Sequence, residues 1–221
     1  MLPSAVAGVF PSRLRRGNFA LSVEVVKRIG LFGGTFDPVH LGHVAIASAA
    51  LQEGLDHLVV MPCRLSPLKI AQGDTTAPTS GDHRLHMLKL AMPDDPRIEV
   101  SRFEIDGPEL SYTWQTLEYL RERFPEDQMV LVIGEDQYQL LGKWAKIHEW
   151  ARTVDFLIFS RQIPTSTENK LKDLKIQLAG SSVPTVSATA VRQALHEKKS
   201  VIGLIPVQVE QYIRDQGLYQ P

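Results

Sequence analysis

The amino-acid sequence predicts an α/β fold, with a doubly wound parallel sheet in a single domain. The first observation behind this prediction is a set of short, continuously apolar runs, such as MVLVIG at 129–134 and VDFLIFS at 154–160. Such runs are typical of strands that are covered on both faces. The second observation is that these runs alternate along the chain with helical segments, which is the order found in parallel sheets with helical crossovers.

The first third of the chain supplies two of the expected strands and one helix between them. KRIGLF at 27–32 is apolar enough for a buried strand, and it ends at Gly33 and Gly34. A helix should follow, because four residues have the spacing i, i+3, i+4 and i+7 of one buried helical stripe. These residues are Val44, Ala47, Ser48 and Leu51. A second strand is expected at 57–61. Residues 62–81 are rich in Pro, Gly, Ser and Thr and should form a long loop that binds a ligand.

The rest of the chain continues the alternation. Asp82 is placed to cap a helix over 83–92, and residues 97–105 have the alternation of a strand. An amphipathic helix is expected at 113–124. Two more helices are expected after the last apolar run, at 187–199 and 206–217. Gly217 is placed to end the second of them.

Length, composition and charge limit the classes of function. With 221 residues, of which 43% are hydrophobic and 22% charged, the chain can bury a full core as one domain, which we place at 27–221. The formal net charge of −1 excludes the basic surface of a sequence-independent nucleic-acid binder. Cys63 is the only cysteine, and no apolar run approaches the roughly 20 residues of a membrane helix. We therefore expect a cytoplasmic protein with neither nucleic acid nor a membrane as partner.

Residues 1–26 are expected to form a flexible N-terminal extension. Residues 1–23 contain Arg13, Arg15 and Arg16 but no acidic side chain, and these charges follow the first apolar residues. That order argues against a secretory signal. An Arg-rich organelle transit peptide and a start codon assigned too early stay open as alternatives.

The turn after the first expected strand carries the strongest chemical signal. Gly33 and Gly34 allow the backbone to approach a phosphate, and the helix that follows directs its N–H groups and positive end at the same place. His40 and His43 are three residues apart, so their rings would share one face of a first helical turn. An isolated histidine there is usually a capping or surface residue, and this pair alone is thin evidence for zinc. Its coincidence with the glycine turn favours an anion site.

Several segments in a fixed order resemble one enzyme family. GGTFDPVHLGH at 33–43 is similar to the H-x-G-H signature of the nucleotidyltransferase superfamily, in the form of the bacterial nicotinate-nucleotide adenylyltransferases. VSATAVR at 186–192 resembles a second motif of that family, and the likeness covers roughly residues 28–219. Further similar segments are SYTWQTL at 111–117, VIGEDQ at 132–137 and KW at 143–144.

The resemblance implies a Rossmann-like fold and adenylyl transfer from ATP to nicotinate mononucleotide, which gives nicotinate adenine dinucleotide and pyrophosphate. The acceptor phosphate is already an anionic nucleophile, so the protein has to position it in line and stabilise charge on the phosphoryl oxygens. The implied catalytic residues are His43 at the α-phosphate, His40 at the phosphate chain and Arg192 at the β- and γ-phosphates. The implied ATP-binding residues are Gly33, Gly34, Thr35, Phe36, Lys69, Gly134, Asp136, Ser187 and Thr189.

The resemblance also implies sites for the two nucleosides. Gly134 and Asp136 would face the ribose of adenosine. The pyridine ring would stack on Trp144, with main-chain donors around Tyr112 and Thr113 for its carboxylate. Mg²⁺ is expected to arrive on the ATP phosphates, without dedicated protein ligands.

The chain departs from the family pattern at one position. Leu68 stands in SPLK at 66–69, where the family usually has P-P-H-K, so one phosphate donor is missing although Lys69 is retained. Other acceptors, namely nicotinamide mononucleotide or phosphopantetheine, stay open, as does a non-catalytic nucleotide-binding regulator. A homo-oligomer is one option for the assembly.

Overall fold

A computed structural model of the chain describes residues 25–73, 78–159, 174–181 and 183–221. The expected flexible extension lies outside the described residues except for its last two positions, so that prediction and the domain bounds stay untested. Within the described part of the chain, no helix has the length and apolar character needed to cross a membrane.

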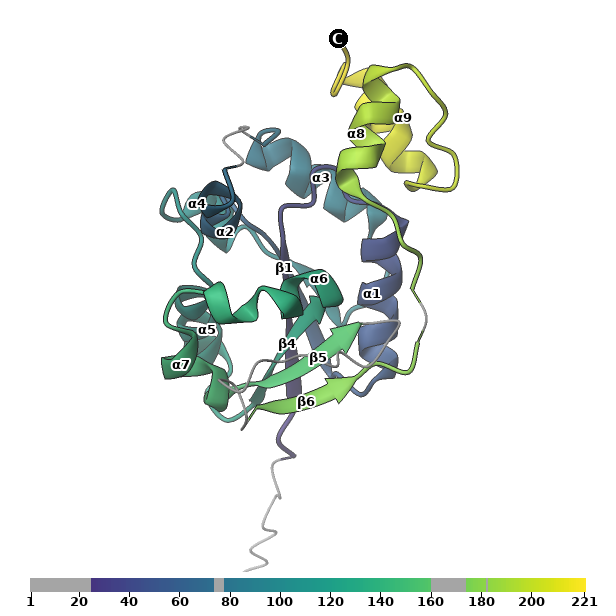
Figure 1. Cartoon of the computed structure of the whole chain (residues 1–221). Helices are drawn as coiled ribbons and strands as arrows, with labels where there is room; N and C mark the ends of the chain where they lie inside the picture. Colours follow the sequence, from purple (N-terminus) through teal and green to yellow (C-terminus); the bar gives the residue numbers. More distant parts are fainter. Residues whose placement is uncertain (1–24, 74–77, 160–173, 182) are drawn as a thin grey trace, which may run out of the picture.

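The sheet consists of six parallel strands in the order β3-β2-β1-β4-β5-β6 (Figure 1). This order reverses between β1 and β4, because the chain first adds strands on one side of β1 and then on the other. Ligands of open parallel sheets bind beyond the carboxyl ends of the strands at such a reversal. The strands are β1 (Arg28–Gly34), β2 (His57–Pro62), β3 (Ile98–Val100), β4 (Gln128–Gly134), β5 (Asp155–Phe159) and β6 (Lys175–Leu178).

Helices cover both faces of the sheet, as a doubly wound fold requires. Neighbouring strand residues point to opposite faces, so Phe32 and Val60 belong to one core and Leu31 and Val59 to the other. The first core is completed by α1 (Leu41–Gln52), α3 (Gly81–Ala91), α8 (Ala188–His196) and α9 (Val207–Asp215). The second is completed by α5 (Thr113–Arg123), α6 (Glu135–Gln139) and α7 (Ile147–Trp150). The predicted fold class is confirmed.

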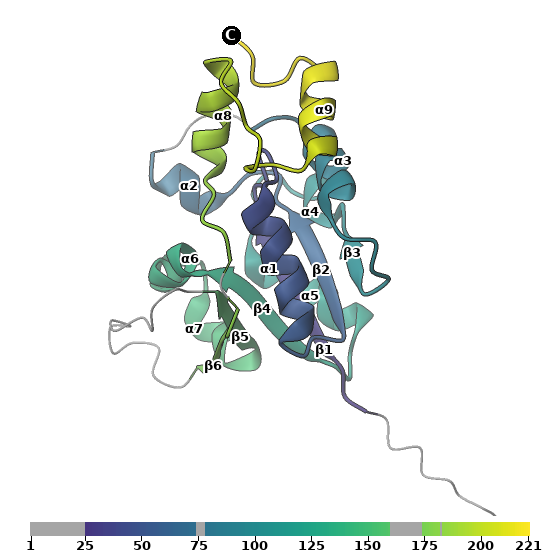
Figure 2. The same ribbon diagram turned by 90° about the vertical axis from the view of Figure 1, so that its right-hand side faces the viewer.

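The two C-terminal helices stand above α1, beyond the carboxyl ends of the strands (Figure 2). The Leu41 N–H at the start of α1 donates to the Leu204 carbonyl between α8 and α9 at 2.9 Å. Tyr212 of α9 stacks on the His86 ring of α3, with the ring centroids 4.4 Å apart. Gly217 has a φ of 61°, and α9 ends two residues before it, so the predicted helix stop is confirmed.

Two predicted segments differ from the structure. Residues 62–81 are not one loop, because α2 (Pro67–Ala71) begins at Pro67, where a fixed φ suits a first helical position, and Ser66 caps it. Residues 97–105 are not one strand. β3 ends at Val100, and the short helix α4 (Phe103–Asp106) follows.

Three smaller differences concern ends and short elements. Ser80, not Asp82, caps α3, because its side chain accepts a hydrogen bond from the His83 N–H at 3.3 Å. The strand β6 was not predicted. The single-turn 3₁₀ helices η1 (Leu141–Lys143) and η2 (Ala151–Thr153), which flank α7, were not predicted either.

Candidate functional site

His40 and His43 form a reciprocal cap at the start of α1. His40 is the N-cap residue, in an extended backbone conformation, and His43 is the third residue of the helix. The Nδ1 atom of His40 accepts from the His43 backbone N–H at 3.3 Å, and the Nδ1 atom of His43 accepts from the His40 backbone N–H at 3.3 Å. The two rings stack with their centroids 3.6 Å apart. They lie together as predicted, although His40 precedes the helix instead of lying in its first turn.

This cap determines which ring atoms are left for a ligand. Because each Nδ1 uses its lone pair as an acceptor, the proton of each neutral ring resides on Nε2. Burial lowers the pKa of His40 from 6.5 to about 4. Burial also lowers the pKa of His43, and the nearby charges of His40 and Lys69 lower it further. At neutral pH the pair therefore offers two neutral Nε2–H donors, not two cations.

The turn at residues 35–38, between β1 and α1, is shaped by the Phe36 ring. Phe36 has a left-handed φ of 50°, and its ring packs edge-on against His43 with the centroids 4.8 Å apart. A Cβ atom on Gly34 would lie 3.0 Å from the Phe36 ring, whereas a Cβ on Gly33 would meet nothing within 4 Å. Gly34 is therefore needed for the packing of Phe36, and the protein leaves space beside Gly33.

Asp37 connects this turn to distant parts of the chain. Its side chain is 6% exposed, and its carboxylate accepts from the Thr79 N–H at 3.1 Å and from the Tyr219 hydroxyl at 2.5 Å. Its backbone carbonyl accepts from Nη1 of Arg192 at 2.7 Å. Burial and the charge of Asp37 raise the pKa of the Tyr219 hydroxyl, which keeps that hydroxyl protonated as a donor.

The start of α8 brings the second motif to the same place. Ser187 is the N-cap residue, and its exposed hydroxyl makes no capping hydrogen bond. Nη2 of Arg192 lies 3.4 Å from Oγ1 of Thr189 in the first turn. A Cβ on Gly42 would lie 2.9 Å from the Pro184 carbonyl oxygen, so the glycine of the H-x-G-H element allows the segment before α8 to cross closely over α1. The structure thus places the two motifs next to each other, and the shared phosphate site that the resemblance implies for them stays a prediction.

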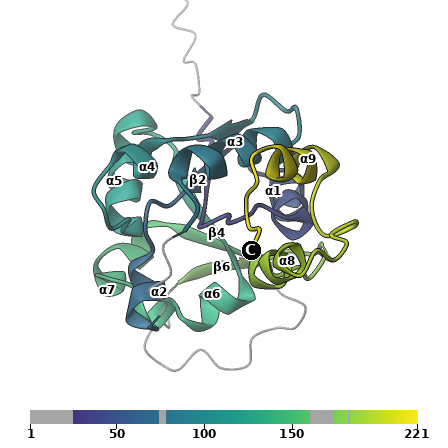
Figure 3. The same ribbon diagram turned by 90° about the horizontal axis from the view of Figure 1, so that it is seen from above.

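Gly134 and Asp136 lie on the other side of the strand reversal. Gly134 ends β4, the strand next to β1, and is the N-cap residue of α6. A Cβ on Gly134 would lie 2.7 Å from Oδ1 of Asp136, so the carboxylate lies against the glycine at the edge of the sheet. Seen from above, α2, α6 and α8 follow one another along one side of the strands (Figure 3).

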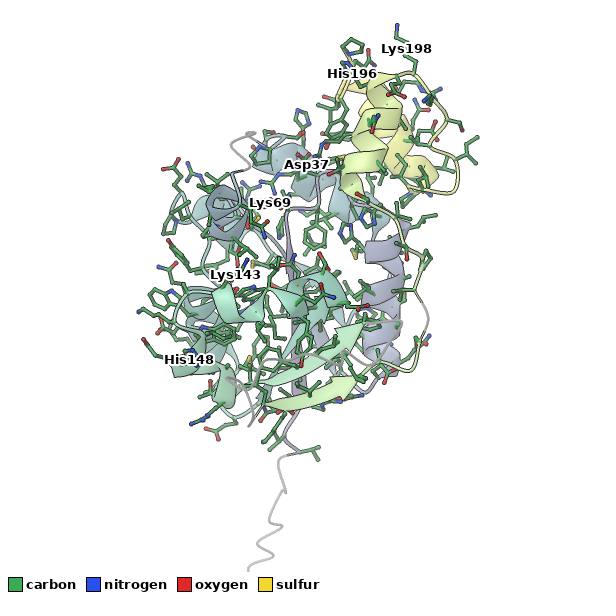
Figure 4. All side chains as sticks on the ribbon, in the orientation of Figure 1. Asp37, Lys69, Lys143, His148, His196 and Lys198 are labelled. Atoms are coloured by element: carbon green, nitrogen blue, oxygen red, sulfur yellow. The ribbon has the colours of Figure 1, made fainter. Side chains whose placement is uncertain are left out.

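Lys69 adds a positive charge from α2. It is close enough to His43 to contribute to the lowering of that ring's pKa. Figure 4 shows Lys69 and Asp37 near the carboxyl ends of the strands, whereas His196 and Lys198 lie at the far end of α8. Leu68 lies in the same short helix and offers no hydrogen-bond donor beyond the backbone.

The three residues predicted to bind the pyridine nucleotide belong to two segments. Tyr112 and Thr113 form the start of α5, where Tyr112 is the N-cap residue and lines a crevice of about 150 Å³. Trp144 ends η1, and no hydrogen bond or ring contact between described residues joins it to Tyr112 or Thr113. Lys146 bridges the segments, with its Nζ atom 3.8 Å from the centroid of the Trp114 ring. Trp144 also has a buried Nε1 atom that finds no hydrogen-bond partner among the described residues.

Sequence reasoning missed four residues that support the site. Glu104 accepts from the Thr116 hydroxyl at 2.5 Å behind the start of α5, and burial raises the pKa of its carboxyl. Arg84 of α3 is 1% exposed and donates to backbone carbonyls around the turn. A signal for Arg84 exists, because it shares the apolar stripe of α3, where a charged residue is out of place. The other two missed residues are Asp37 and Tyr219.

Comparison with known proteins relates this geometry to a family. Residues 31–194 match the family described as cytidylyltransferase-like. The nicotinate-nucleotide adenylyltransferase of Bacillus subtilis is 36% identical over 200 residues, which cover 88% of this chain and 100% of the relative.

Solved structures give the same fold. Plasmodium falciparum nicotinic acid mononucleotide adenylyltransferase, complexed with NaAD, has a TM-score of 0.68 at 20% identity, covering 87% of this chain and 97% of that one. The same Plasmodium protein complexed with APC has a TM-score of 0.67 at 20% identity, with the same coverage of both chains.

The first prediction concerns the protonation of the histidine pair. Unfolded histidine titrates near 6.5, whereas folded His40 has a pKa of about 4, so the fold should lose stability as the pH falls from 6.5 towards 4. Nitrogen NMR of the rings should show both as Nε2–H tautomers at pH 7. A midpoint near 6.5 for either ring, or an Nδ1–H tautomer, would contradict the capping assignment.

The second prediction concerns Tyr219→Phe, which removes one of the two donors to the buried Asp37 carboxylate. We expect a loss of about 1–3 kcal/mol in the free energy of unfolding, measured with urea. The matched control is Tyr119→Phe, whose hydroxyl meets Arg123 at the surface and should cost under about 0.5 kcal/mol. Equal effects of the two variants would show that the Asp37 contact has no special weight.

Proposed function

Because the chain belongs to the nicotinate-nucleotide adenylyltransferase family of cytidylyltransferase-like proteins, we propose that it transfers the adenylyl group of ATP to nicotinate mononucleotide. The products are nicotinate adenine dinucleotide and pyrophosphate, and the reaction is a step of NAD biosynthesis. The observation that carries the proposal is the meeting of the His40–His43 cap with Arg192 at the strand reversal.

The reaction needs no covalent intermediate with the protein. A phosphate oxygen of the mononucleotide attacks the α-phosphorus of ATP, the bond from that phosphorus to the bridging oxygen breaks, and the electron pair leaves with pyrophosphate. The described geometry supports stabilisation of the charge that develops on the phosphoryl oxygens. We assign the Nε2–H of His43 to the α-phosphate and that of His40 to the phosphate chain.

The leaving pyrophosphate requires donors and positive charge on the far side of the reacting phosphorus. We assign this role to the exposed Ser187 hydroxyl, to Thr189 and to the guanidinium of Arg192, which can bind two oxygens at once. Lys69 approaches from α2. In the turn, the backbone N–H groups of Thr35 and Phe36 donate to no acceptor among the described residues. We propose that they donate to the phosphates.

The nucleosides are proposed to lie on either side of the phosphates. Asp136 and Gly134 would receive the adenosine ribose at the end of β4. The start of α5, at Tyr112 and Thr113, would bind the pyridine carboxylate, because a helix N-terminus offers backbone donors to an anion. Trp144 would stack on the ring, which requires it to approach Tyr112 when the mononucleotide binds.

We propose that Mg²⁺ enters with ATP, bound through phosphate oxygens and water. The described residues contain no group of three or more His, Cys, Asp or Glu side chains that could hold a metal ion. When bound, the ion would neutralise part of the phosphate charge. The residues described above would orient the phosphates and stabilise the charge that the ion does not neutralise.

A further proposal concerns the location of the enzyme. We place the enzyme in the cytoplasm, since the single cysteine suits a reducing compartment. The assembly state, for which a homo-oligomer was one option, is measurable by light scattering.

The function is tested by pyrophosphate release from ATP and Mg²⁺ with three acceptors in parallel: nicotinate mononucleotide, nicotinamide mononucleotide and phosphopantetheine. We expect strong preference for the first. Preference for another acceptor would overturn the substrate assignment, and ATP binding without release for any acceptor would favour a regulator.

The third prediction concerns His43→Ala. Loss of one donor to the transition state should lower kcat about 100-fold or more with nicotinate mononucleotide. The matched control is His196→Ala, because His196 lies at the far end of α8 (Figure 4) and its loss should leave kcat unchanged. An unchanged kcat in His43→Ala would remove this histidine from the catalytic role.

The fourth prediction concerns Trp144→Ala. Loss of stacking should raise the KM for nicotinate mononucleotide about tenfold and leave the KM for ATP within about twofold. His148→Ala, on the outer side of α7 (Figure 4), is the control and should change neither value. The stacking role fails if the KM for the mononucleotide does not change.

A further inference from the structure

Arg84 is a buried arginine that the proposed reaction does not yet use. It lies on α3, its exposed fraction is 1%, and the other buried residues of that helix are apolar. Burying a guanidinium in such a place is costly unless its donors and its charge are both satisfied.

The N–H groups of Arg84 donate to backbone carbonyls in and near the turn at residues 35–38. Nη1 donates to the Thr35 carbonyl at 2.8 Å and to the Cys63 carbonyl at 2.7 Å. Nε donates to the Thr79 carbonyl at 2.7 Å, and Nη2 lies 3.4 Å from the Arg64 carbonyl. One side chain thus joins the segments that follow β1 and β2 to the segment before α3.

The charge of Arg84 has no such partner. Among the described residues no carboxylate forms an ion pair with it, whereas the arginines Arg102 and Arg123 pair with Asp106 and Glu99 at 2.9 Å. The buried Glu104 carboxyl accepts its hydrogen bond from the Thr116 hydroxyl and not from Arg84. Arg84 thus lies beneath the turn without an ion-pair partner among the described residues, and the buried Asp37 carboxylate is hydrogen-bonded to Thr79 and Tyr219 instead.

The bond to Thr35 also sets the direction of a donor. In a trans peptide the carbonyl and the N–H point to opposite sides. Because Arg84 holds the Thr35 carbonyl from within the protein, the N–H of Phe36 in the same peptide unit points away from Arg84. That N–H has no hydrogen-bond partner among the described residues, and Phe36 is held at a φ of 50°, which side chains rarely adopt.

We propose that Arg84 is a positioning residue of the phosphate site: it holds the Thr35–Phe36 peptide with the Phe36 N–H towards the phosphates, and its unpaired charge favours a polyphosphate above the turn. The identity of that polyphosphate as ATP or pyrophosphate rests on the proposed function. The orienting role is independent of which acceptor the enzyme uses.

The test compares Arg84→Met, which removes the charge, with Arg84→Lys, which keeps it. The probe is inorganic pyrophosphate, titrated by calorimetry at fixed ionic strength, with Arg102→Met as a control that removes an exposed arginine. We expect affinity to fall about tenfold or more in Arg84→Met, to recover to within about threefold of the wild type in Arg84→Lys, and to be unchanged in the control.

Two results would overturn the proposal. In one, both folded Arg84 variants bind pyrophosphate within about twofold of the wild type, and in the other Arg84→Lys binds no better than Arg84→Met. Near-ultraviolet circular dichroism establishes folding. If Arg84→Met does not fold, wild-type protein provides a second test, since the Phe36 amide resonance must shift on addition of pyrophosphate, and an unmoved resonance rejects the orienting role. If that resonance shifts but nicotinate mononucleotide is not adenylylated, the proposed acceptor fails and the Arg84 proposal stands.

Discussion

Hydrogen bonds to the turn at residues 35–37 hold together parts of the chain that are far apart in sequence. Arg84 of α3 binds the Thr35 carbonyl, Arg192 of α8 binds the Asp37 carbonyl, and Tyr219 binds the Asp37 carboxylate. Because each of these donors comes from a different element, the turn fixes where α3, α8 and the segment after α9 lie relative to the end of β1. The proposed phosphate site is the region on which these elements converge.

In this site the histidines provide neutral hydrogen-bond donors, and other side chains provide the positive charge. His40 and His43 use their Nδ1 atoms to cap α1, and the same hydrogen bonds determine the tautomer that leaves Nε2–H for phosphate. The pair caps the helix, and the same hydrogen bonds leave it suited to the proposed role at the phosphates. Permanent charge comes instead from arginine and lysine side chains, which keep their charge over the whole physiological pH range.

The elements of the fold could be predicted where the local sequence pattern determines them. The site residues could be predicted only where they belong to a recognisable motif. Runs such as 129–134 are apolar because both faces of the strand are covered, so they could be identified as strands. The strand β6 was not predicted because three of its four side chains are exposed. The helix α4 was not predicted because Phe103 and Ile105 also fit a strand. Tyr219 could not be assigned, because a hydrogen bond to a carboxylate across the fold leaves no periodic trace in sequence, whereas the one signal for Arg84 is its place in the apolar stripe of α3.

The contact between Asp37 and Tyr219 spans 182 positions of the chain. During synthesis on the ribosome, the first half of the sheet and its glycine turn emerge long before this tyrosine, while the Asp37 carboxylate still lacks one of its donors. The turn therefore gains its full set of hydrogen bonds only after the last residues of the chain have been made and have docked.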